Sequence, residues 1–530
     1  MLVWLVVIPI LIAAFLFILP YKKATLIITI IVQLLLFCCA IYMFRLCKEG
    51  EIITKIGSYK GVMGITLKAD TLSSLFVMLT AFIFLVAALY SFNENLGRLY
   101  SFLMFIWEGL LIGIFLSGDF FNIFVLIEVS TVVVSILIML KRDNRSMYDG
   151  MVYLMVNTVA IQFYLFGMGY IYKITGVLDM EASAQVIKSL DKASLLLPYA
   201  LIITSISLKC ALMPLFSWLP RAHSTPGAPS SVSAVLSGLH IKSGIYLFIR
   251  FESIFHEISV PELFLAIGII TGVVGFLFAL SQTDIKLILA YHTISQIGMI
   301  MIGLSSAGIY SHTGGIYHII NHALFKSSLF LSAGIISHSY GSRDITKIRG
   351  VMKRLPLTGA AVIMAVFGIT GAPFFNGSIS KYFIASGADT MVNGAIILIN
   401  FGTIVSFIKY STILTGQCDT EKNAKKPDLC QQAAVLILGA ICLAGGIFGE
   451  QFIKFLFGIN VSIDSIGYLQ KAILFALSAI TGYFIYKHVV LKKEFFKKIR
   501  EIELSFRGIC VSLGIFFAVI LIITRVFAFQ

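Results

Sequence analysis

The chain has 530 residues, of which 58% are hydrophobic and only 12% are charged, and its formal net charge is +14. An ordinary soluble domain has about 25% charged residues, so this composition excludes a water-soluble protein and indicates many membrane spans. We assign the excess positive charge to contacts with anionic lipid headgroups, and it gives no reason to expect a nucleic-acid partner. Nearly all of the chain is needed for the spans, which leaves no room for a soluble catalytic domain.

The apolar runs predict sixteen helices that are long enough to cross a membrane. The first run has neither the basic start nor the small-residue cleavage site of a signal peptide, so we expect it to be retained as a span. In chain order the predicted spans cover residues 2–20, 24–46, 68–91, 98–116, 118–141, 147–173, 195–217, 227–251, 260–281, 285–306, 312–338, 356–388, 391–416, 431–456, 466–490 and 506–527.

Lysine and arginine gather in the loops after spans 1, 5, 7, 11 and 15. Such residues accumulate on the cytoplasmic side, so we predict that the odd-numbered loops face the cytoplasm and that both termini face outward. The loop after span 2 also carries lysines and departs from this pattern. Between the last two spans, residues 487–503 mix basic residues with Phe495, Phe496 and Ile499, which predicts an amphipathic helix at the cytoplasmic surface.

Eight cysteines are scattered along the chain. They form no CxxC pair and have no His/Cys ligand spacing, so neither an iron–sulfur cluster nor a zinc site is expected. Most lie in apolar runs, where a cysteine usually acts as a small buried hydrophobic residue. We therefore expect no cofactor and no metal in this chain.

The stretch from residue 203 to residue 250 is unlike an ordinary membrane helix, because Lys209 and Lys242 lie in its apolar runs. A lysine at the bilayer centre costs about 2.5 to 3.5 kcal/mol on insertion scales, so it usually faces the interior of the bundle. Proline frees a backbone carbonyl, which lipid tolerates only where it is buried in protein or faces water. The four prolines between the lysines are Pro214, Pro220, Pro226 and Pro229. This pattern predicts a broken helix and a path for charge at mid-membrane.

A second broken helix follows five spans later, in the segment 356–388. Its interruption reads GITGAPFFNGSISKYF, and Lys381 lies just after the break. An odd offset of five spans turns the second copy upside down in the membrane. Inverted repeats with corresponding broken helices are the architecture of many ion transporters, with the working groups at the midplane.

Other ionisable residues lie within predicted spans. His318, His322 and Lys326 are four residues apart and share one helical face, which suggests a relay of proton-carrying side chains. Glu128 lies near the middle of the span 118–141. Residues that we consider only as possible accessory groups are Glu108, His292 and Lys409.

Four long motifs, in this order, are GDFFNIFVLIEV, SWLPRAHSTPGAPSSVSAVLSGLHIKSGIYLFIR, QTDIKLILAYHTISQIGM and IYHIINHALFKSSLFLSAG. On these motifs the chain resembles the antiporter-like membrane subunits shared by Mrp-type Na+/H+ antiporters, respiratory complex I and membrane-bound hydrogenases. The sequence GDFFN and the histidine of AYHTISQIG are most similar to those of the Mrp D-type and hydrogenase branches.

The resemblance implies an all-α polytopic fold of about fourteen core helices, with about two extra spans at the C-terminal end. It implies N-terminal helices at 1–97, two inverted five-helix repeats at 98–251 (spans 4–8) and 260–416 (spans 9–13), and C-terminal helices at 431–530. The two broken helices, spans 7 and 12, would then occupy corresponding places in the repeats.

The resemblance also implies roles for the buried ionisable residues. Glu128 would pair with Lys209. The lysine would keep its proton while it is paired and would release the proton when the carboxylate moves away. The further members of the implied proton relay are Lys242, His318, His322, Lys326 and Lys381. Each of these residues has a structural alternative as a buried pair or a hydrogen-bonded packing residue.

Two classes of function are consistent with this sequence. In the first, the chain is a subunit of an Mrp-type antiporter that exchanges protons for Na+ or another monovalent cation. In the second, it is the proton- or sodium-translocating subunit of a redox complex, such as a membrane-bound hydrogenase or a complex I-like enzyme, whose electrons run in partner subunits. A third interpretation is a paralogue that only scaffolds the membrane arm. All of them predict other membrane subunits as partners and the cell membrane of a prokaryote as the location.

Overall fold

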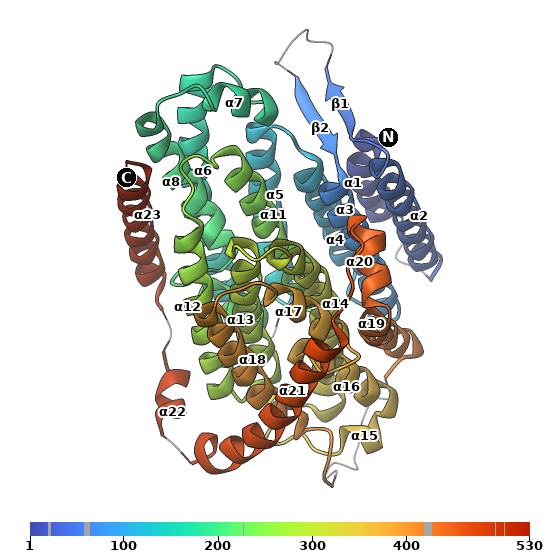
Figure 1. Cartoon of the computed structure of the whole chain (residues 1–530). Helices are drawn as coiled ribbons and strands as arrows, with labels where there is room; N and C mark the ends of the chain where they lie inside the picture. Colours follow the sequence, from blue (N-terminus) through green and yellow to red (C-terminus); the bar gives the residue numbers. More distant parts are fainter. Residues whose placement is uncertain are drawn as a thin grey trace. The chain divides into compact units, whose positions relative to one another are not determined.

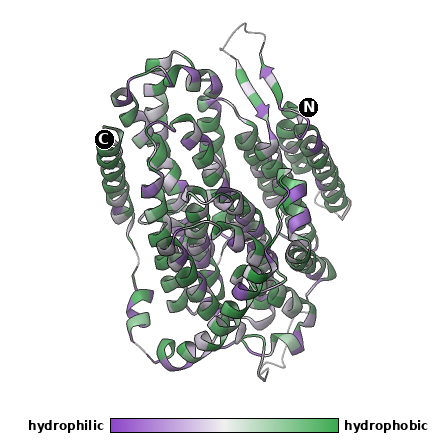
Figure 2. Cartoon of the chain, viewed as in Figure 1, coloured by the Kyte–Doolittle hydropathy of each residue, from purple (hydrophilic) through white to green (hydrophobic). Residues whose placement is uncertain are grey.

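The computed structural model describes residues 1–19, 23–57, 64–225, 227–417, 427–492, 494–502 and 504–529. Fourteen of its helices are long and apolar enough to cross a membrane, and α1 (Leu2–Ile18) and α16 (Pro356–Thr370) are shorter apolar helices. Most helices are hydrophobic along much of their length (Figure 2). Each of the sixteen predicted spans coincides with one helix or with a run of two or three consecutive helical elements, so the predicted polytopic helical fold is confirmed. Pro226 lies outside the described residues.

The chain divides into two compact units, and the division interrupts the sequence twice. Unit 1 contains residues 1–228, 239–260 and 504–530, and unit 2 contains residues 229–238 and 261–503. The last membrane helix therefore belongs to the same unit as the first ones. The short segment 229–238 belongs to unit 2, although the residues on both sides of it belong to unit 1.

Unit 1 is a bundle of helices with one β-hairpin. Within it α1 packs on α4, α2 on α3, and both α5 and α8 on α6, while the C-terminal helix α23 packs on α8. Besides α1, its elements are α2 (Lys23–Cys47), β1 (Ile52–Ile56), β2 (Ile65–Ala69), α3 (Thr71–Tyr90), α4 (Arg98–Leu116), α5 (Phe120–Ile138), α6 (Asn144–Thr175), α7 (Met180–Ile187), α8 (Lys192–Lys209), α9 (Trp218–Ser224), α11 (Ile241–Ile254) and α23 (Phe506–Ala528).

Unit 2 is a second helical bundle, in which α14 is the most widely packed helix. It contacts α10, α13, α16, α17 and α19. Besides α16, the elements of unit 2 are α10 (Ser230–Val235), α12 (Pro261–Ser281), α13 (Ile285–Ser305), α14 (Ser311–Tyr340), α15 (Val351–Arg354), α17 (Asn376–Ile384), α18 (Thr390–Ser411), α19 (Leu429–Ile447), α20 (Gly449–Phe457), α21 (Ser465–Ile485), the π-helical η2 (Tyr486–Val490) and α22 (Phe495–Arg500). The π-helical turn η1 (Leu236–His240) follows α10 in the chain and runs directly into α11.

Aspartate residues start many of these helices. A carboxylate at the N-cap position accepts a hydrogen bond from a backbone N–H that the first turn leaves unpaired. Eight helices have an N-cap aspartate whose side chain makes this bond: Asp70, Asp119, Asp143, Asp179, Asp284, Asp389, Asp428 and Asp464. The few acidic residues of this chain therefore mark where many of its helices begin.

Each of the two units contains an antiparallel backbone bridge between two aspartate residues. In unit 1, Asp119 at the start of α5 forms an antiparallel bridge with Asp179, which follows α6. In unit 2, Asp284 at the start of α13 forms the same bridge with Asp344, which follows α14. The members of the second bridge follow those of the first by the same number of residues.

The β-hairpin between α2 and α3 was not predicted. Its strands pair antiparallel from Ile52 opposite Ala69 to Ile56 opposite Ile65, and Figure 1 shows it beside the ends of α2 and α3. The predicted span 68–91 therefore starts too early, because its first residues belong to β2 and the helix begins only after the N-cap Asp70.

Two predictions near the C-terminal end are also corrected. The amphipathic helix predicted at 487–503 is reduced to α22, because residues 486–490 continue α21 as the π-helical turn η2. Within unit 2, α22 packs on α12, and Arg500 Nε donates to the Ser281 carbonyl at 2.8 Å. The span predicted at 431–456 consists of two helices, α19 and α20, which meet at Phe448. Residues 493 and 503 lie outside the described part of the chain.

An ion pair fixes the start of α3 against α11. Arg250 Nη2 lies 2.7 Å from the Asp70 carboxylate, and Arg250 Nε donates to the Tyr246 hydroxyl at 3.0 Å. The Tyr246 hydroxyl in turn donates to the Phe115 carbonyl at 2.7 Å. Burial favours the neutral carboxyl, but the hydrogen bond and the charge of Arg250 outweigh it and hold the pKa of Asp70 below its ordinary value of 3.8.

We expect Asp70→Asn to destabilise the folded chain by about 2 kcal/mol, the usual size of a hydrogen bond to a charged group. Because the pKa of Asp70 is lowered on folding, this stabilisation is fully present above pH 3.8 and is lost as the pH falls through the lower folded value. The unfolding temperature of the purified chain in detergent measures the effect. A variant that unfolds like the wild type at neutral pH would contradict it, and so would a difference that persists in strong acid.

Candidate functional site

Two helices are interrupted where the sequence predicts breaks. In unit 1, α8 ends at Lys209, and the chain runs through a non-helical segment before α9 begins at Trp218. In unit 2, α16 ends at Thr370, and Gly371 follows in the left-handed conformation with a φ of 76°, which glycine adopts without strain. A new helix, α17, then carries Lys381. Each break is therefore accompanied by one buried lysine.

Lys209 lies in a polar pocket inside unit 1. Its side chain is 5% exposed, and its Nζ lies 3.4 Å from Nε2 of His240. A cavity of about 10 Å³ beside it is lined in part by Thr131, Asn157 and Ser205. This volume is close to the minimum that one water molecule needs. The terminal amine therefore faces neutral polar groups at the end of its helix.

Glu128 does not form the predicted ion pair with Lys209 in this conformation. It lies on α5, half-buried, and its Oε2 is buried without a hydrogen-bond partner among the described residues. The two charges are nevertheless close enough to act on one another electrostatically. The structure therefore places Glu128 near Lys209, but beyond the distance that an ion pair requires.

His240 is a residue of this site that the sequence analysis missed. It is fully buried at the end of η1 and lies between three helices of unit 1. Trp107 Nε1 of α4 donates to its Nδ1 at 3.3 Å, and the Tyr153 hydroxyl of α6 lies 2.9 Å from its Nε2. A histidine within the apolar run SGLHIKSG was the available signal, because a polar residue in a span usually faces the bundle interior. The π-helical turn, which often marks a functional site, became visible only in the structure.

Lys242 lies two residues after His240 on α11 and is fully buried. Residues two apart on a helix do not share a face, so Lys242 and His240 point in different directions. The transfer from Lys209 to Lys242 that the resemblance implies stays a prediction.

The histidines of α14 lie together, as their spacing predicts. His318 and His322 have ring centroids 6.4 Å apart, and the ring of Phe325 lies beside both. His318 Nδ1 lies 2.8 Å from Ser380 Oγ and its Nε2 lies 3.1 Å from Gln296 Oε1. Ser380 directly precedes Lys381 in the chain. One end of the histidine column is therefore connected to the helix that carries that lysine.

Lys326 continues this column but is anchored by backbone. Its Nζ donates to the Leu289 carbonyl of α13 at 2.6 Å and lies 6.0 Å from the centroid of the Phe330 ring. The side chain is fully buried. It therefore lies in the interior of unit 2, with a neutral oxygen as an acceptor.

Lys381 lies at the wall of a cavity in unit 2. Its Nζ donates to the Ile369 carbonyl at 2.6 Å and to Asn400 Oδ1 at 2.7 Å. Ile369 lies in the last turn of α16, where carbonyls have no partner within the helix. The cavity has a volume of about 160 Å³, room for several water molecules. Asn400 was not identified from the sequence, because it becomes a partner only where α17 and α18 pack together.

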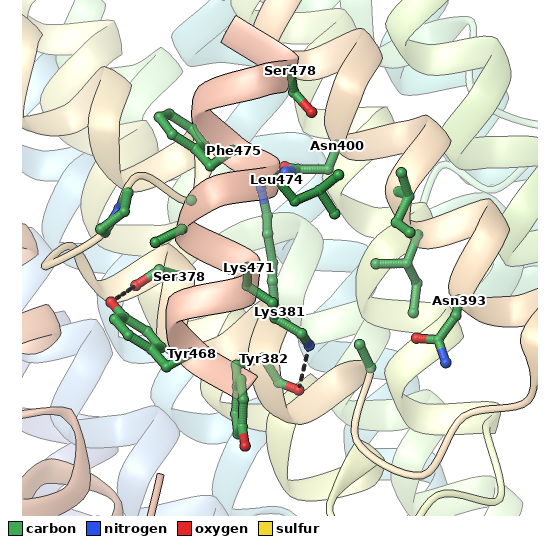
Figure 3. Close-up of a pocket in the computed structure, with 16 residues that line it drawn as sticks. Ser378, Lys381, Tyr382, Asn393, Asn400, Tyr468, Lys471, Leu474, Phe475 and Ser478 are labelled. Carbon is green, nitrogen blue, oxygen red and sulfur yellow. Dashed lines mark hydrogen bonds between the residues drawn. The ribbon is translucent and has the colours of Figure 1, made fainter. Parts of the chain in front are cut away.

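Helices α17, α18 and α21 enclose this cavity (Figure 3). The Ser378 and Tyr468 hydroxyls are 2.9 Å apart, which joins α17 to α21. Lys471 Nζ of α21 donates to the Tyr382 carbonyl at 3.4 Å. The first of the two extra C-terminal spans thus forms one side of the space that Lys381 faces.

The three possible accessory residues have different surroundings. Glu108 is fully buried on α4 and accepts a hydrogen bond from Gln33 Nε2 at 2.5 Å. The rings of His292 and Phe407 are in tilted contact with centroids 4.6 Å apart, and neither ring nitrogen of His292 has a hydrogen-bond partner in the described part of the chain. Both residues are closely packed within their own units.

Lys409 has the contacts of a helix cap. Its Nζ donates to the carbonyls of Leu280, at 2.6 Å, and of Gln282, both at the C-terminal end of α12. Lysine side chains commonly satisfy the last carbonyls of a helix in this way. Arg500 of α22 binds the Ser281 carbonyl between them. The structure therefore favours a structural role for Lys409.

A helical membrane bundle with buried lysines at two helix breaks defines a polytopic membrane protein of the transporter class. Residues 117–408 match the family model described as "NADH:quinone oxidoreductase/Mrp antiporter, TM". This match covers more than half of the chain, so the chain belongs to that family. The resemblance drawn from the four motifs is confirmed.

One curated relative is the D-type subunit of the Na(+)/H(+) antiporter of Alkalihalophilus pseudofirmus. It is 33% identical over 347 residues, which are 63% of this chain and 69% of the relative. A chain of the Mrp complex from Dietzia sp. has a similar fold, with a TM-score of 0.79 and 22% identity over 94% of this chain and 99% of that one.

A chain of an archaeal respiratory complex, the membrane-bound sulfane sulfur reductase, is also similar in fold. Its TM-score is 0.77, with 23% identity over 91% of this chain and 99% of that one. Both solved structures are too distant in sequence to indicate more than the fold.

We expect Lys409→Met to lower the thermal stability of the chain without abolishing a transport step in the molecules that remain folded. Each buried carbonyl left without a donor costs about 1–3 kcal/mol. The unfolding temperature in detergent and the amount of protein in the membrane measure this loss. Lys454→Met, at an exposed position of α20, is the control for removing a lysine. A stable but inactive Lys409→Met protein would refute the capping role.

Proposed function

We propose that this chain is the ion-translocating subunit of a multi-subunit membrane complex, and that it moves protons coupled to Na+ or another monovalent cation, as in an Mrp-type antiporter. The observation that carries the proposal is the pair of buried lysines, Lys209 and Lys381, each at a helix break and each bonded to uncharged groups. A costly buried cation that lacks an ion-pair partner among the described residues is better explained by proton transfer than by structure. The antiporter subunit among its relatives supports this choice.

In this proposal, Lys209 and Lys381 each bind and release one proton. Lys209 holds a proton when Glu128 turns toward it and releases it when the carboxylate turns away. The nearby small cavity gives space for a water molecule to receive the proton. Lys242 is the next member of the path in unit 1.

Lys381 exchanges its proton with water in the larger cavity that it faces. The proton reaches the α14 column through His318, which is hydrogen-bonded to Ser380. His322 and Lys326 are the further members on the same face of α14. A histidine suits this task because its ordinary pKa lies near physiological pH.

We further propose that residues 98–251 and 260–416 are inverted repeats. The matching aspartate bridges of α5 with the segment after α6, and of α13 with the segment after α14, support a common construction. The breaks after α8 and after α16 then occupy equivalent places. We propose the cell membrane of a prokaryote as the location, with both termini outside, on the charge pattern of the loops.

The alternative is a subunit that pumps protons or Na+ within a redox complex. A chain of an archaeal respiratory complex has a similar fold, so the fold is compatible with this alternative. The two functions predict different partner subunits, because the redox complex must contain electron carriers and the antiporter needs none.

We expect Glu128→Ala, Lys209→Ala and Lys381→Ala each to abolish ion-coupled transport while the protein still inserts in the membrane. Each change removes a proton-carrying group or the charge that controls it. Proton uptake driven by an imposed cation gradient, measured in membrane vesicles, tests this expectation. Lys188→Ala, an exposed position after α7, is the matched control and retains transport. Wild-type transport by any of the three variants at normal protein levels would remove that residue from the path.

Isolation of the native complex distinguishes the two proposed functions. We expect only other membrane subunits to copurify with the tagged chain in mild detergent, because ion gradients alone drive an antiporter. Mass spectrometry of the subunits and metal analysis of the same sample are the measurements. Subunits with iron–sulfur or nickel–iron centres would instead select the redox complex.

A further inference from the structure

His240 is surrounded by hydrogen-bonding groups from three helices of unit 1. Trp107 Nε1 reaches its Nδ1 at 3.3 Å, while the Tyr153 hydroxyl and Lys209 Nζ reach its Nε2 at 2.9 Å and 3.4 Å. All four side chains are buried. The two ring nitrogens thus have different partners, and these partners determine where the ring carries its proton.

Trp107 fixes the tautomer of His240. The indole N–H can only donate a hydrogen bond, so Nδ1 of the histidine must accept and carries no proton. A neutral imidazole then carries its proton on Nε2. A doubly protonated ring would place two N–H donors against each other at Nδ1, next to the charge of Lys209. The contact with Trp107 therefore selects the neutral ring with an Nε2–H group.

The selected tautomer distinguishes between the two protonation states of Lys209. An ammonium group has three donors and no acceptor, so it cannot form a hydrogen bond with an Nε2–H group. A neutral amine has a lone pair that accepts this bond. When Lys209 is charged, Nε2–H has the Tyr153 hydroxyl as its acceptor, and both acceptors are within reach of the ring as it stands. The tautomer consequently favours the neutral lysine.

The other titratable groups around this pair come from neighbouring elements. Glu128 of α5 favours the charged form of Lys209 by its negative charge. Tyr153 of α6 and Cys210, which follows Lys209 in the chain, are buried beside Lys209. Lys242 of α11 lies close in sequence to His240. Among these groups, Glu128 and His240 act on Lys209 in opposite directions.

We propose that Trp107 and His240 are positioning residues that weaken proton binding by Lys209 and so set the pH range of transport. The indole holds the imidazole in the tautomer that accommodates only the neutral amine well. Glu128, by approaching or withdrawing, then decides between binding and release of the proton. This inference rests on the proposed function, because it assigns a regulatory role around Lys209.

The first test observes the tautomer directly in the full chain. Nitrogen-15 magnetic resonance of histidine-labelled protein in lipid, compared with the His240→Gln variant, identifies the signals of His240. We expect a protonated Nε2 and an unprotonated Nδ1 in the wild type. A ring protonated on Nδ1, or on both nitrogens at neutral pH, would overturn the inference. This measurement does not depend on transport activity or on the folding of a Trp107 variant.

The second test changes the donor and follows the pH profile of transport in membranes that contain the whole complex. Trp107→Phe keeps an aromatic ring against Phe84, whose centroid is 5.9 Å away, and removes the N–H group. The freed ring can then offer the Nε2 lone pair to the ammonium of Lys209. We expect the pH of half-maximal transport to rise by about one unit. The free energy of a hydrogen bond to a charged group equals or exceeds the free energy that corresponds to one pKa unit.

Trp218→Phe is the matched control. Trp218 is also buried in unit 1, and its Nε1 donates to the Leu208 carbonyl at 2.9 Å, which does not titrate. The Trp218→Phe variant loses the same indole N–H group as Trp107→Phe, and we expect it to show no shift of the pH profile. An unshifted Trp107→Phe profile, or equal shifts in both variants, would overturn the inference while wild-type transport upholds the proposed function. If wild-type membranes show no transport that depends on Lys209, the proposed function itself is refuted.

Discussion

The interaction on which much of this structure depends is the hydrogen bond between a buried lysine and a neutral oxygen or nitrogen. In unit 2, Lys326, Lys381 and Lys409 all donate to backbone carbonyls. A carbonyl accepts a hydrogen bond both from an amine and, more strongly, from an ammonium group, because both carry N–H donors. Such a lysine gains or loses its proton without losing its anchor. A carboxylate partner would instead bind the charged form much more strongly.

The surroundings of the buried lysines also differ between Lys409 and Lys381. Lys409 binds successive carbonyls at the end of α12, so its bonds hold a helix end in place. Lys381 binds a carbonyl freed by a helix break and one amide oxygen, and it faces a cavity of about 160 Å³. Access to a cavity, rather than burial or the number of bonds, is what distinguishes the proposed proton carrier Lys381 from the cap Lys409.

The two helix breaks present their lysines in different ways. At the first break, the partner of Lys209 is His240, an imidazole whose tautomer is set by an indole from another helix. At the second break, the partners of Lys381 are a backbone carbonyl and the Asn400 amide oxygen. The first lysine is thus sensitive to a titratable neighbour, whereas the second is held by groups that do not titrate. The two halves of the path need not respond to pH alike.

The sequence by itself determined the class of the protein, the order of its apolar helices, the two breaks, and the buried lysines. These follow from hydropathy, proline and the cost of a charge in lipid, which act locally along the chain. It did not reveal the β-hairpin, the short length of α22, or the assignment of α23 to the unit of the first helices.

Only the tertiary structure decided which partner each buried group has. Three pairs lie on different helices and meet because these helices pack together: Trp107 with His240, Lys381 with Asn400, and Lys409 with the end of α12. No periodicity encodes such contacts, since a helical face can be read from spacing but the residue opposite it cannot. The buried lysines could be predicted, whereas His240, Asn400 and the role of each group depended on the packing.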